Sequence, residues 1–248
     1  MCLCCDANGV AVGFRIPSIG GKETPCSAAI GSRGGAIDMD VKNNIFTESS
    51  FSEITKRAMA FFEGTEFYSL PVQERFNGAG VYAIYYTGEN ELYSLLGQKR
   101  IDEQRIPIYV GKAVPSGWRQ GRKKVSDAPH LFHRLNEHCR SITKADNLSI
   151  ENFSCRFTIL VDEITSLIGV LESELIGKYT PIWNSCIDGF GNHDPGAGRY
   201  EQARSEWDTL HPGRIWASKL NDNLNSVSDI KNKGISFLES VGGDIEDT

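Results

Sequence analysis

Two short segments of the sequence each carry a tyrosine beside a valine and a glycine, in opposite orders. They read Gly80-Val81-Tyr82 and Tyr109-Val110-Gly111. A guanidinium, an imidazole, a carboxylate and an amide follow, and they belong to Arg134, His138, Glu172 and Asn184. A carboxylate suits Mg²⁺, a guanidinium forms a two-pronged pair with a phosphate, and phenols and imidazoles transfer protons. These are the groups that hydrolysis of a phosphodiester requires.

Regular elements must position these side chains, and the sequence pattern predicts both kinds. β-Branched and aromatic runs predict strands, and apolar residues at three- and four-residue steps predict helices. The expected strands are 80–86, 108–111 and 155–161, and the expected helices are 50–62, 131–142 and 164–179. Arg134 and His138 then share one helix face, and Pro181 turns the chain so that Asn184 returns toward the same region. The order predicts an α/β (α+β) core, a small three-stranded sheet flanked by helices.

The first expected helix has the clearest N-terminal signal. Ser50 and Glu53 have the spacing of a capping box, and Gly64 offers a stop. The apolar positions expected to face the core are Phe51, Ile54, Ala58, Phe61 and Phe62.

Composition separates the two ends of the chain from this core. Residues 1–40 hold seven glycines and four cysteines without a periodic pattern, and we expect a flexible extension there. Residues 217–248 are expected to form an acidic C-terminal tail. Its one apolar cluster, Ile235, Phe237 and Leu238, is either a helix docked on the core or a frayed end.

The formal net charge of −6 argues against a protein that coats nucleic acid through bulk electrostatics. The charge is uneven, because Gly111–Arg140 holds seven basic and two acidic residues, whereas Asn221–Thr248 holds six acidic and two basic. Such a basic window is a solvated face or a nucleic-acid contact. No apolar stretch is long enough to cross a membrane, and no secretory signal is visible, so we expect a cytoplasmic protein. The seven cysteines lack the spacing of a zinc site and predict no disulfides.

The two tripeptides, followed in order by Arg134, His138, Glu172 and Asn184, resemble the GIY-YIG nuclease superfamily. The segments 107–115, 117–120, 153–157, 188–193 and 195–199 are similar to the small restriction endonucleases of this superfamily that cut the palindrome CCGCGG. The resemblance runs from about Phe51 to Trp216 and implies a GIY-YIG endonuclease domain over 45–216. Valine replaces isoleucine in both tripeptides, which leaves the tyrosines in place.

The resemblance implies a role for each side chain. Glu172 would hold a single Mg²⁺, for which Mn²⁺ could substitute, and Arg134 would stabilise the transition state. Tyr82 is the preferred general base, provided that Mg²⁺, His138 or Lys112 lowers its pKa. Tyr109 would position water or phosphate, His138 would hold or accept the proton, and Asn184 would orient a catalytic side chain. The division of roles between the two tyrosines and His138 stays open.

A palindromic target predicts a homodimer on double-stranded DNA, with one active site for each strand. It also implies a cognate DNA methyltransferase that protects the host genome. Residues expected to contact DNA lie in two basic, glycine-bounded segments. They are Arg119, Gln120, Arg122, Asn192, His193, Arg199, Gln202 and Arg204.

Other interpretations of the same residues remain open. Strand tyrosines commonly serve core packing, Glu172 could form a surface ion pair, and Arg134 could be a helix-surface arginine. At the level of the whole chain, the alternatives are a structure-selective repair or homing nuclease and a DNA-binding protein without catalytic activity.

Overall fold

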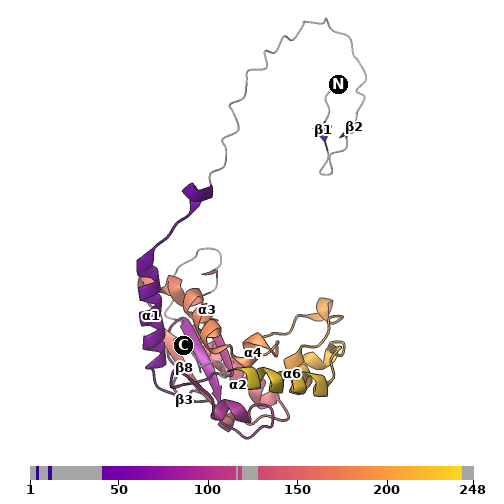
Figure 1. Cartoon of the computed structure of the whole chain (residues 1–248). Coiled ribbons are helices and arrows are strands. Elements are labelled where there is room, and N and C mark those ends of the chain that lie inside the picture. Colours follow the sequence, from indigo (N-terminus) through magenta and orange to yellow (C-terminus); the bar gives the residue numbers. More distant parts are fainter. Residues whose placement is uncertain (1–3, 6–10, 13–40, 116, 119–127, 242–248) are drawn as a thin grey trace, which may run out of the picture. The chain divides into compact units, whose positions relative to one another are not determined.

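The computed structural model describes residues 4–5, 11–12, 41–115, 117–118 and 128–241 (Figure 1). The chain divides into two units, Met1–Thr47 and Glu48–Thr248. In the first unit, strands β1 (Cys4–Cys5) and β2 (Ala11–Val12) pair antiparallel, and a 3₁₀ helix, η1, covers Val41–Asn44. The flexible extension expected at 1–40 falls mostly outside the described residues.

An antiparallel sheet of four strands, in the order β3-β8-β4-β7, forms the centre of the second unit. The strands are β3 (Tyr68–Ser69), β4 (Gly80–Tyr86), β7 (Tyr109–Ala113) and β8 (Phe153–Ile159). The strand expected at 80–86 is confirmed, and all seven of its residues are buried. The sheet has one strand more than the expected three, because β3 pairs with β8 at the edge. With only two residues, β3 is too short to show an alternating pattern in the sequence.

The alternation of side chains along β4 divides the core into two layers. Tyr82, Ile84 and Tyr86 pack with Leu131, Leu135 and other apolar residues of α2 (His130–Lys144). On the other face, Val81, Ala83 and Tyr85 pack against α1 (Ser49–Glu63) and α3 (Ile168–Tyr179). The α/β class and the helices on both faces of the sheet are therefore confirmed.

Helix α1 departs from its expected cap and its expected buried face. It begins one residue earlier, at Ser49, and the carboxylate of Glu48 accepts a hydrogen bond from the Ser50 backbone N–H at 3.0 Å. Only Thr55 and Phe62 are buried, whereas Phe51, Ile54 and Phe61 are exposed. The capping-box prediction was wrong because the preceding glutamate takes the N-cap position that the pattern gave to serine.

The remaining elements follow β7 and α3 or connect the strands. They are η2 (Ser94–Gly97), β5 (Arg100–Ile101), β6 (Gln104–Arg105), η4 (Ile150–Asn152), η5 (Asp162–Leu167), α4 (Ile182–Ser185), η6 (Ala197–Arg199), α5 (Glu206–Leu210), η7 (Ala217–Lys219) and α6 (Val227–Ser240). Strands β5 and β6 form a separate two-stranded hairpin. No helix among the described residues is both long and apolar enough to cross a membrane.

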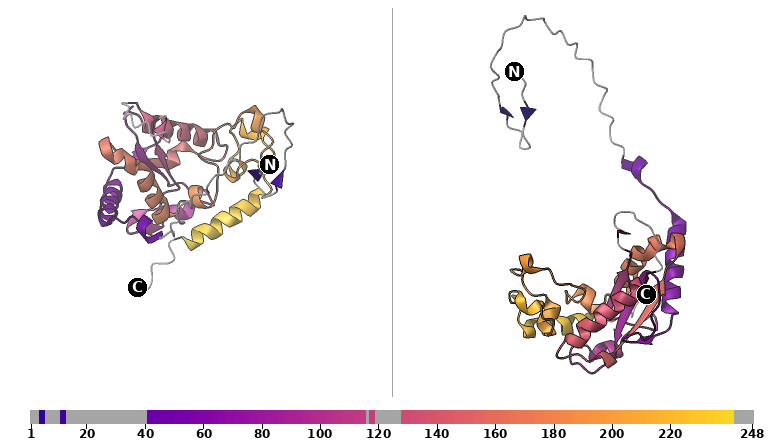
Figure 2. Two further views of the ribbon diagram at one scale, coloured as in Figure 1. Left: turned by 90° about the horizontal axis from the view of Figure 1, so that it is seen from above. Right: turned by 180° about the vertical axis from the view of Figure 1, so that it is seen from behind.

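Helix α6 lies within the segment expected to be an acidic tail. It starts at a capping box between Ser226 and Asp229, and it packs against α4 and α5. Figure 2 shows it as the long yellow helix. Ile230 and Leu238 are buried in the same apolar cluster as Tyr82. Of the two interpretations of the apolar cluster in this segment, the structure shows the docked helix.

Candidate active site

The two tyrosines of the tripeptides lie on neighbouring strands and on the same face of the sheet. Tyr82 stands opposite Gly111, and Tyr109 stands opposite Ile84. A Cβ atom at position 111 would lie 2.5 Å from the phenol oxygen of Tyr82, which is closer than two such atoms can approach. Glycine at 111 is therefore what allows the Tyr82 ring to lie across β7.

Tyr82 and His138 form a buried hydrogen-bonded pair. The phenol oxygen lies 2.6 Å from Nε2 of His138, and the residues are 0% and 2% exposed. Burial raises the pKa of Tyr82 well above its usual value, and the nearby Tyr109 adds to this effect. Burial lowers the pKa of His138 well below its usual value, and the charge of Arg134 adds to this effect. Both side chains are therefore neutral at neutral pH, and the imidazole can accept a hydrogen bond from the phenol O–H.

We expected groups of the protein to lower the pKa of a phenol, but the surroundings of both tyrosines raise it. Burial raises the pKa of Tyr109 as well as that of Tyr82, and the charge of Arg134 offsets only part of the rise in each case. Lys112, one of the groups expected to act on the phenol, forms its ion pair with Glu172. A lower pKa must therefore come from groups that substrate binding adds.

Arg134 extends from α2, and its guanidinium makes hydrogen bonds to Glu137, His193 and Gly191 beside the two phenols. Its Nη1 atom lies 2.8 Å from a carboxylate oxygen of Glu137 and 2.8 Å from Nε2 of His193, and its Nη2 atom donates to the Gly191 carbonyl at 3.1 Å. Burial alone would lower the pKa of Arg134, but Tyr82 and Glu137 outweigh it, and the net shift is upward. The guanidinium keeps its charge and lies at the edge of the tyrosine pair.

Glu172 reaches the site from α3, on the other side of the edge strand β7. Its carboxylate forms an ion pair with the ammonium of Lys112, whose position opposite Val81 puts it on the face of β7 away from Tyr82. The side chain of Glu172 is only 18% exposed. Its charge nevertheless contributes to raising the pKa of both Tyr82 and Tyr109, so the carboxylate and the phenols lie within electrostatic reach of each other.

Asn184 acts on the backbone of β7 and not on a catalytic side chain. Its Oδ1 atom accepts from the Val110 N–H, and its Nδ2 atom donates to the Val110 carbonyl, both at 2.8 Å. Helix α3 ends at Thr180, which has a left-handed backbone with φ of 41°, and Pro181 then leads into α4. The amide closes the free edge of β7 next to Tyr109, so Asn184 holds the strand that carries this tyrosine.

The sequence also matches a known protein family. The family model of the Eco29kI GIY-YIG domain, a restriction-endonuclease domain, matches residues 74–238 of the 248. The chain belongs to the Eco29kI GIY-YIG family. It is therefore a restriction-type nuclease, a hydrolase that binds DNA. A search of curated proteins found no match.

The donor set of this Eco29kI-family site fits Mg²⁺ bound through one carboxylate. Among the described residues, no three His, Cys, Asp or Glu side chains converge on a common point. Mg²⁺ needs only one or two carboxylates when water and a substrate phosphate supply the other oxygens. The Glu172 carboxylate is paired with the cationic Lys112, so a metal ion at this carboxylate would have to displace the ammonium. The cysteines at 139, 155 and 186 are free thiols and take no part in the site.

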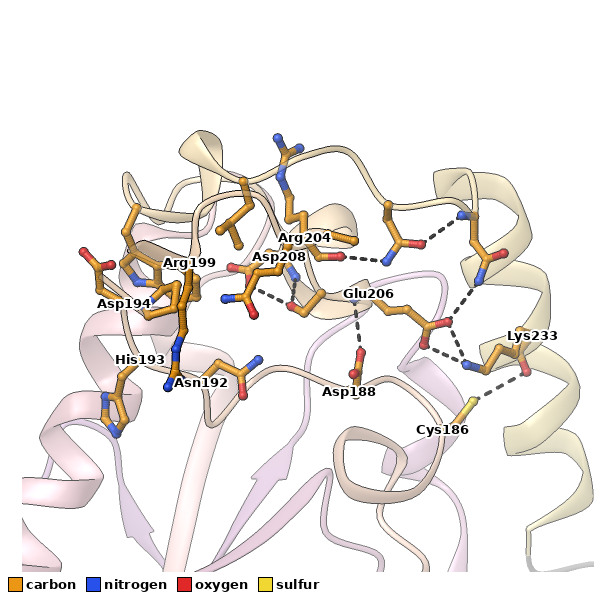
Figure 3. Close-up of a pocket in the computed structure, with 18 residues that line it drawn as sticks. Cys186, Asp188, Asn192, His193, Asp194, Arg199, Arg204, Glu206, Asp208 and Lys233 are labelled. Carbon is orange, nitrogen blue, oxygen red and sulfur yellow. Dashed lines mark hydrogen bonds and ion pairs between the residues drawn. The ribbon is translucent and has the colours of Figure 1, made fainter. Parts of the chain in front are cut away.

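Five of the residues expected to contact DNA line one cavity of about 870 Å³ beside the Eco29kI-family site (Figure 3). They are Asn192, His193, Arg199, Gln202 and Arg204. The other three, Arg119, Gln120 and Arg122, lie outside the described residues. Sequence reasoning missed Glu206 and Lys233, which form an ion pair at the other end of this cavity, because they come from α5 and α6, beyond the basic segments.

Arg199 and Arg204 differ in what holds them. Arg204 donates from Nε to the Ala217 carbonyl at 3.1 Å and lies 3.4 Å from a carboxylate oxygen of Asp222. Arg199 has no ion pair or side-chain hydrogen bond with the described residues, and Figure 3 shows it beside Asn192. Of the two arginines, Arg199 is the one whose donors are available to a ligand.

Proposed function

We propose that the protein is a Mg²⁺-dependent type II restriction endonuclease that cuts double-stranded DNA at the palindrome CCGCGG. The observation that carries this proposal is the convergence of Tyr82, His138, Arg134 and Glu172 in a chain of the Eco29kI GIY-YIG family. Perturbed pKa values in a cluster that borders a cavity are typical of functional sites, and His138 and Arg134 line such a cavity.

Arg134 binds the scissile phosphate and stabilises the charge that develops on it. Phosphate binding also changes His138, because the positive charge of Arg134 is one of the causes that lower the pKa of this imidazole. A phosphate against Arg134 offsets that charge, so the pKa of His138 rises when substrate binds. The imidazole becomes a better proton acceptor only in the complex.

The proton of the attacking water passes through Tyr82 to His138. As the water oxygen attacks phosphorus, its proton moves to the phenol oxygen, and the phenol proton moves along the existing hydrogen bond, 2.6 Å between oxygen and nitrogen, to Nε2. The bond from phosphorus to the 3′ oxygen breaks, and that oxygen later takes a proton from solvent. This relay keeps Tyr82 neutral, which suits a phenol whose pKa burial has raised.

Glu172 holds the Mg²⁺, and Tyr109 positions the water or the phosphate. When bound, Mg²⁺, or Mn²⁺ in its place, supplies positive charge for the phosphoryl oxygens and the leaving group. Lys112, the present ion-pair partner of Glu172, would then be available to contact the phosphate. Asn184 keeps the strand of Tyr109 in place through Val110.

Recognition of the GC-rich site uses the cavity of Figure 3. Arg199 offers a guanidinium for guanine, with no side-chain partner in the part of the chain that the structure describes, and Asn192 and Gln202 offer amides for the other bases. The palindrome is read by a homodimer, with one active site for each strand. A cognate methyltransferase protects the host genome, and a cell that makes the nuclease alone is expected to suffer chromosome breaks.

The test uses the full chain and two duplexes of the same composition, one with a single CCGCGG and one with GGCGCC in its place. With Mg²⁺ we expect cleavage of the first only, and none with EDTA. Glu172→Gln, which keeps the size of the side chain and removes its charge, is expected to lose cleavage by at least about 100-fold. Its affinity for the CCGCGG duplex, measured in Ca²⁺, is expected to stay close to that of the wild type.

The alternatives predict different results. Discrete cuts at another sequence would keep the nuclease and overturn the CCGCGG specificity. Cleavage that depends on branches or flaps would favour a repair nuclease. A folded wild-type chain that binds duplex DNA, never cuts it and is unchanged by Glu172→Gln would favour the DNA-binding protein without catalytic activity.

A further inference from the structure

One loop of the recognition cavity contacts the catalytic arginine directly. Two hydrogen bonds of Arg134 end on the loop Gly189–His193, at the Gly191 carbonyl at 3.1 Å and at Nε2 of His193 at 2.8 Å. Glu137, which also binds Arg134, is one helical turn away on α2. In Figure 3, His193 lies at the opposite end of the cavity from Lys233. The side chain expected to read DNA is therefore engaged with Arg134.

The direction of this hydrogen bond is fixed by the chemistry of the two groups. A guanidinium has five N–H donors and no acceptor. Nε2 of His193 must therefore accept, which requires an uncharged ring with its proton on Nδ1. A carboxylate and an imidazole nitrogen then share Nη1 of Arg134, while the Gly191 carbonyl takes Nη2. These bonds fix the plane of the guanidinium next to Tyr82 and Tyr109.

A buried ion pair holds the loop that supplies these contacts. Arg214 and Asp208 are 4% and 2% exposed, and both nitrogens that reach the carboxylate lie 2.6 Å from its oxygens. Arg214 also donates to the carbonyls of three loop residues, Gly189, Phe190 and Asn192, at 2.9 to 3.2 Å. The guanidinium of Arg214 thus holds the backbone of the loop Gly189–His193 in place.

The same loop also touches the proton acceptor. The Phe190 ring stacks on the His138 ring with 4.5 Å between centroids and 19° between planes. A Cβ atom at position 191 would lie 2.9 Å from the Tyr109 phenol oxygen, so the backbone approaches the site closely. A displacement of the loop would therefore disturb Arg134, His138 and Tyr109 together.

We infer that His193 is a positioning residue for Arg134, and that the loop Gly189–His193 couples sequence recognition to catalysis. The inference rests on the proposed function and goes beyond it. A correct site that settles the loop in this conformation completes the hydrogen bonds that aim Arg134 at the phosphate. A wrong site that shifts the loop leaves Arg134 misdirected, even when the DNA is bound.

The test compares His193→Ala with His193→Gln, because the glutamine Oε1 can accept a hydrogen bond at a similar reach. Single-turnover cleavage of the CCGCGG duplex is expected to fall by about 10- to 100-fold in His193→Ala and to recover to within about threefold of wild type in His193→Gln. The dissociation constant in Ca²⁺ is expected to change less than about threefold in both. His133→Ala, an exposed histidine next to Arg134 without a contact to it among the described residues, serves as control and is expected to keep the wild-type rate.

The opposite pattern would overturn the inference. Weaker binding with an unchanged cleavage rate would make His193 a base-reading residue, and equal loss in both variants would exclude an acceptor role. Nitrogen-15 spectra of the Arg134 guanidinium, assigned with Arg134→Lys, provide a readout that needs no cleavage. Slow rotation about the guanidinium bonds is expected in the wild type and in His193→Gln, and fast rotation in His193→Ala. If the wild type cuts no duplex, the proposed function fails, and these spectra still decide the positioning role.

Discussion

Two tyrosine–histidine pairs lie in the core of this protein, and their central hydrogen bonds have the same length. Tyr82 and His138 are 2.6 Å apart between the phenol oxygen and Nε2, and so are Tyr93 and His211. In both pairs burial raises the pKa of the phenol and lowers the pKa of the imidazole. Distance and burial alone therefore do not distinguish them.

The pairs differ in what surrounds them. The Tyr93 oxygen also accepts from Nε1 of Trp183 at 3.0 Å, and Nδ1 of His211 lies 2.8 Å from Oδ1 of Asn147. Every hydrogen-bonding group of this second pair has a partner within the protein. His138, by contrast, lines a cavity of about 180 Å³ together with Arg134. A satisfied network supports the fold, whereas a pair that opens beside a charged group can exchange protons with a substrate.

The largest expected difference between the two pairs is in the cleavage rate after the hydroxyl of Tyr82 or of Tyr93 is removed. Tyr82→Phe is expected to lower the single-turnover cleavage rate by about 10²- to 10⁴-fold, because the water loses its proton acceptor. Tyr93→Phe is expected to stay within about threefold of wild type at a temperature where circular dichroism shows both variants folded. Similar losses in the two variants would mean that the surroundings do not set the role of the pair.

The regular part of the catalytic site could be predicted from the sequence. Strand 80–86 and the helix with Arg134 and His138 follow from alternation and from three- and four-residue spacing, and the order of the motif residues follows from the resemblance. Asn184 was expected near the site, but its clamp on Val110 depends on the free edge of β7, which only the assembled sheet defines.

The second pair and the loop support could not be predicted, because both join distant segments without a local pattern. Tyr93 and His211 are 118 residues apart, and neither lies in a motif. Arg214 and Asp208 are close in sequence, but the carbonyls that Arg214 binds belong to a loop more than twenty residues earlier. The face of α1 was predicted with Phe51 and Phe61 inside, and both are exposed, because periodicity shows that a helix is amphipathic without showing which residues its neighbours cover.

A smaller effect is expected on stability, and it should run in the opposite order. Tyr93→Phe leaves the N–H of Trp183 and Nε2 of His211 without partners, which is expected to lower the free energy of unfolding by about 1–3 kcal/mol. Tyr82→Phe removes a hydroxyl from a site that opens toward a cavity, and the expected loss is about half as large. Urea unfolding measures both, with Tyr68→Phe as control, because the Tyr68 side chain is exposed. A larger loss for Tyr82→Phe would make the first pair the structural one.

The last effect concerns the free energy of unfolding at acid pH. Burial lowers the pKa of His211 to about 3, so the unfolded chain takes up a proton near pH 6.5 while the folded protein does not. The free energy of unfolding therefore falls as the pH drops from 6.5 toward 3, by up to about 1.4 kcal/mol per pH unit for this histidine. His211→Gln and His138→Gln should each remove the contribution of one proton from the slope of the unfolding free energy against pH. Only His138→Gln should also lose cleavage. A wild-type slope in His211→Gln would mean that His211 takes up its proton in the folded protein, and the second network would then not be closed.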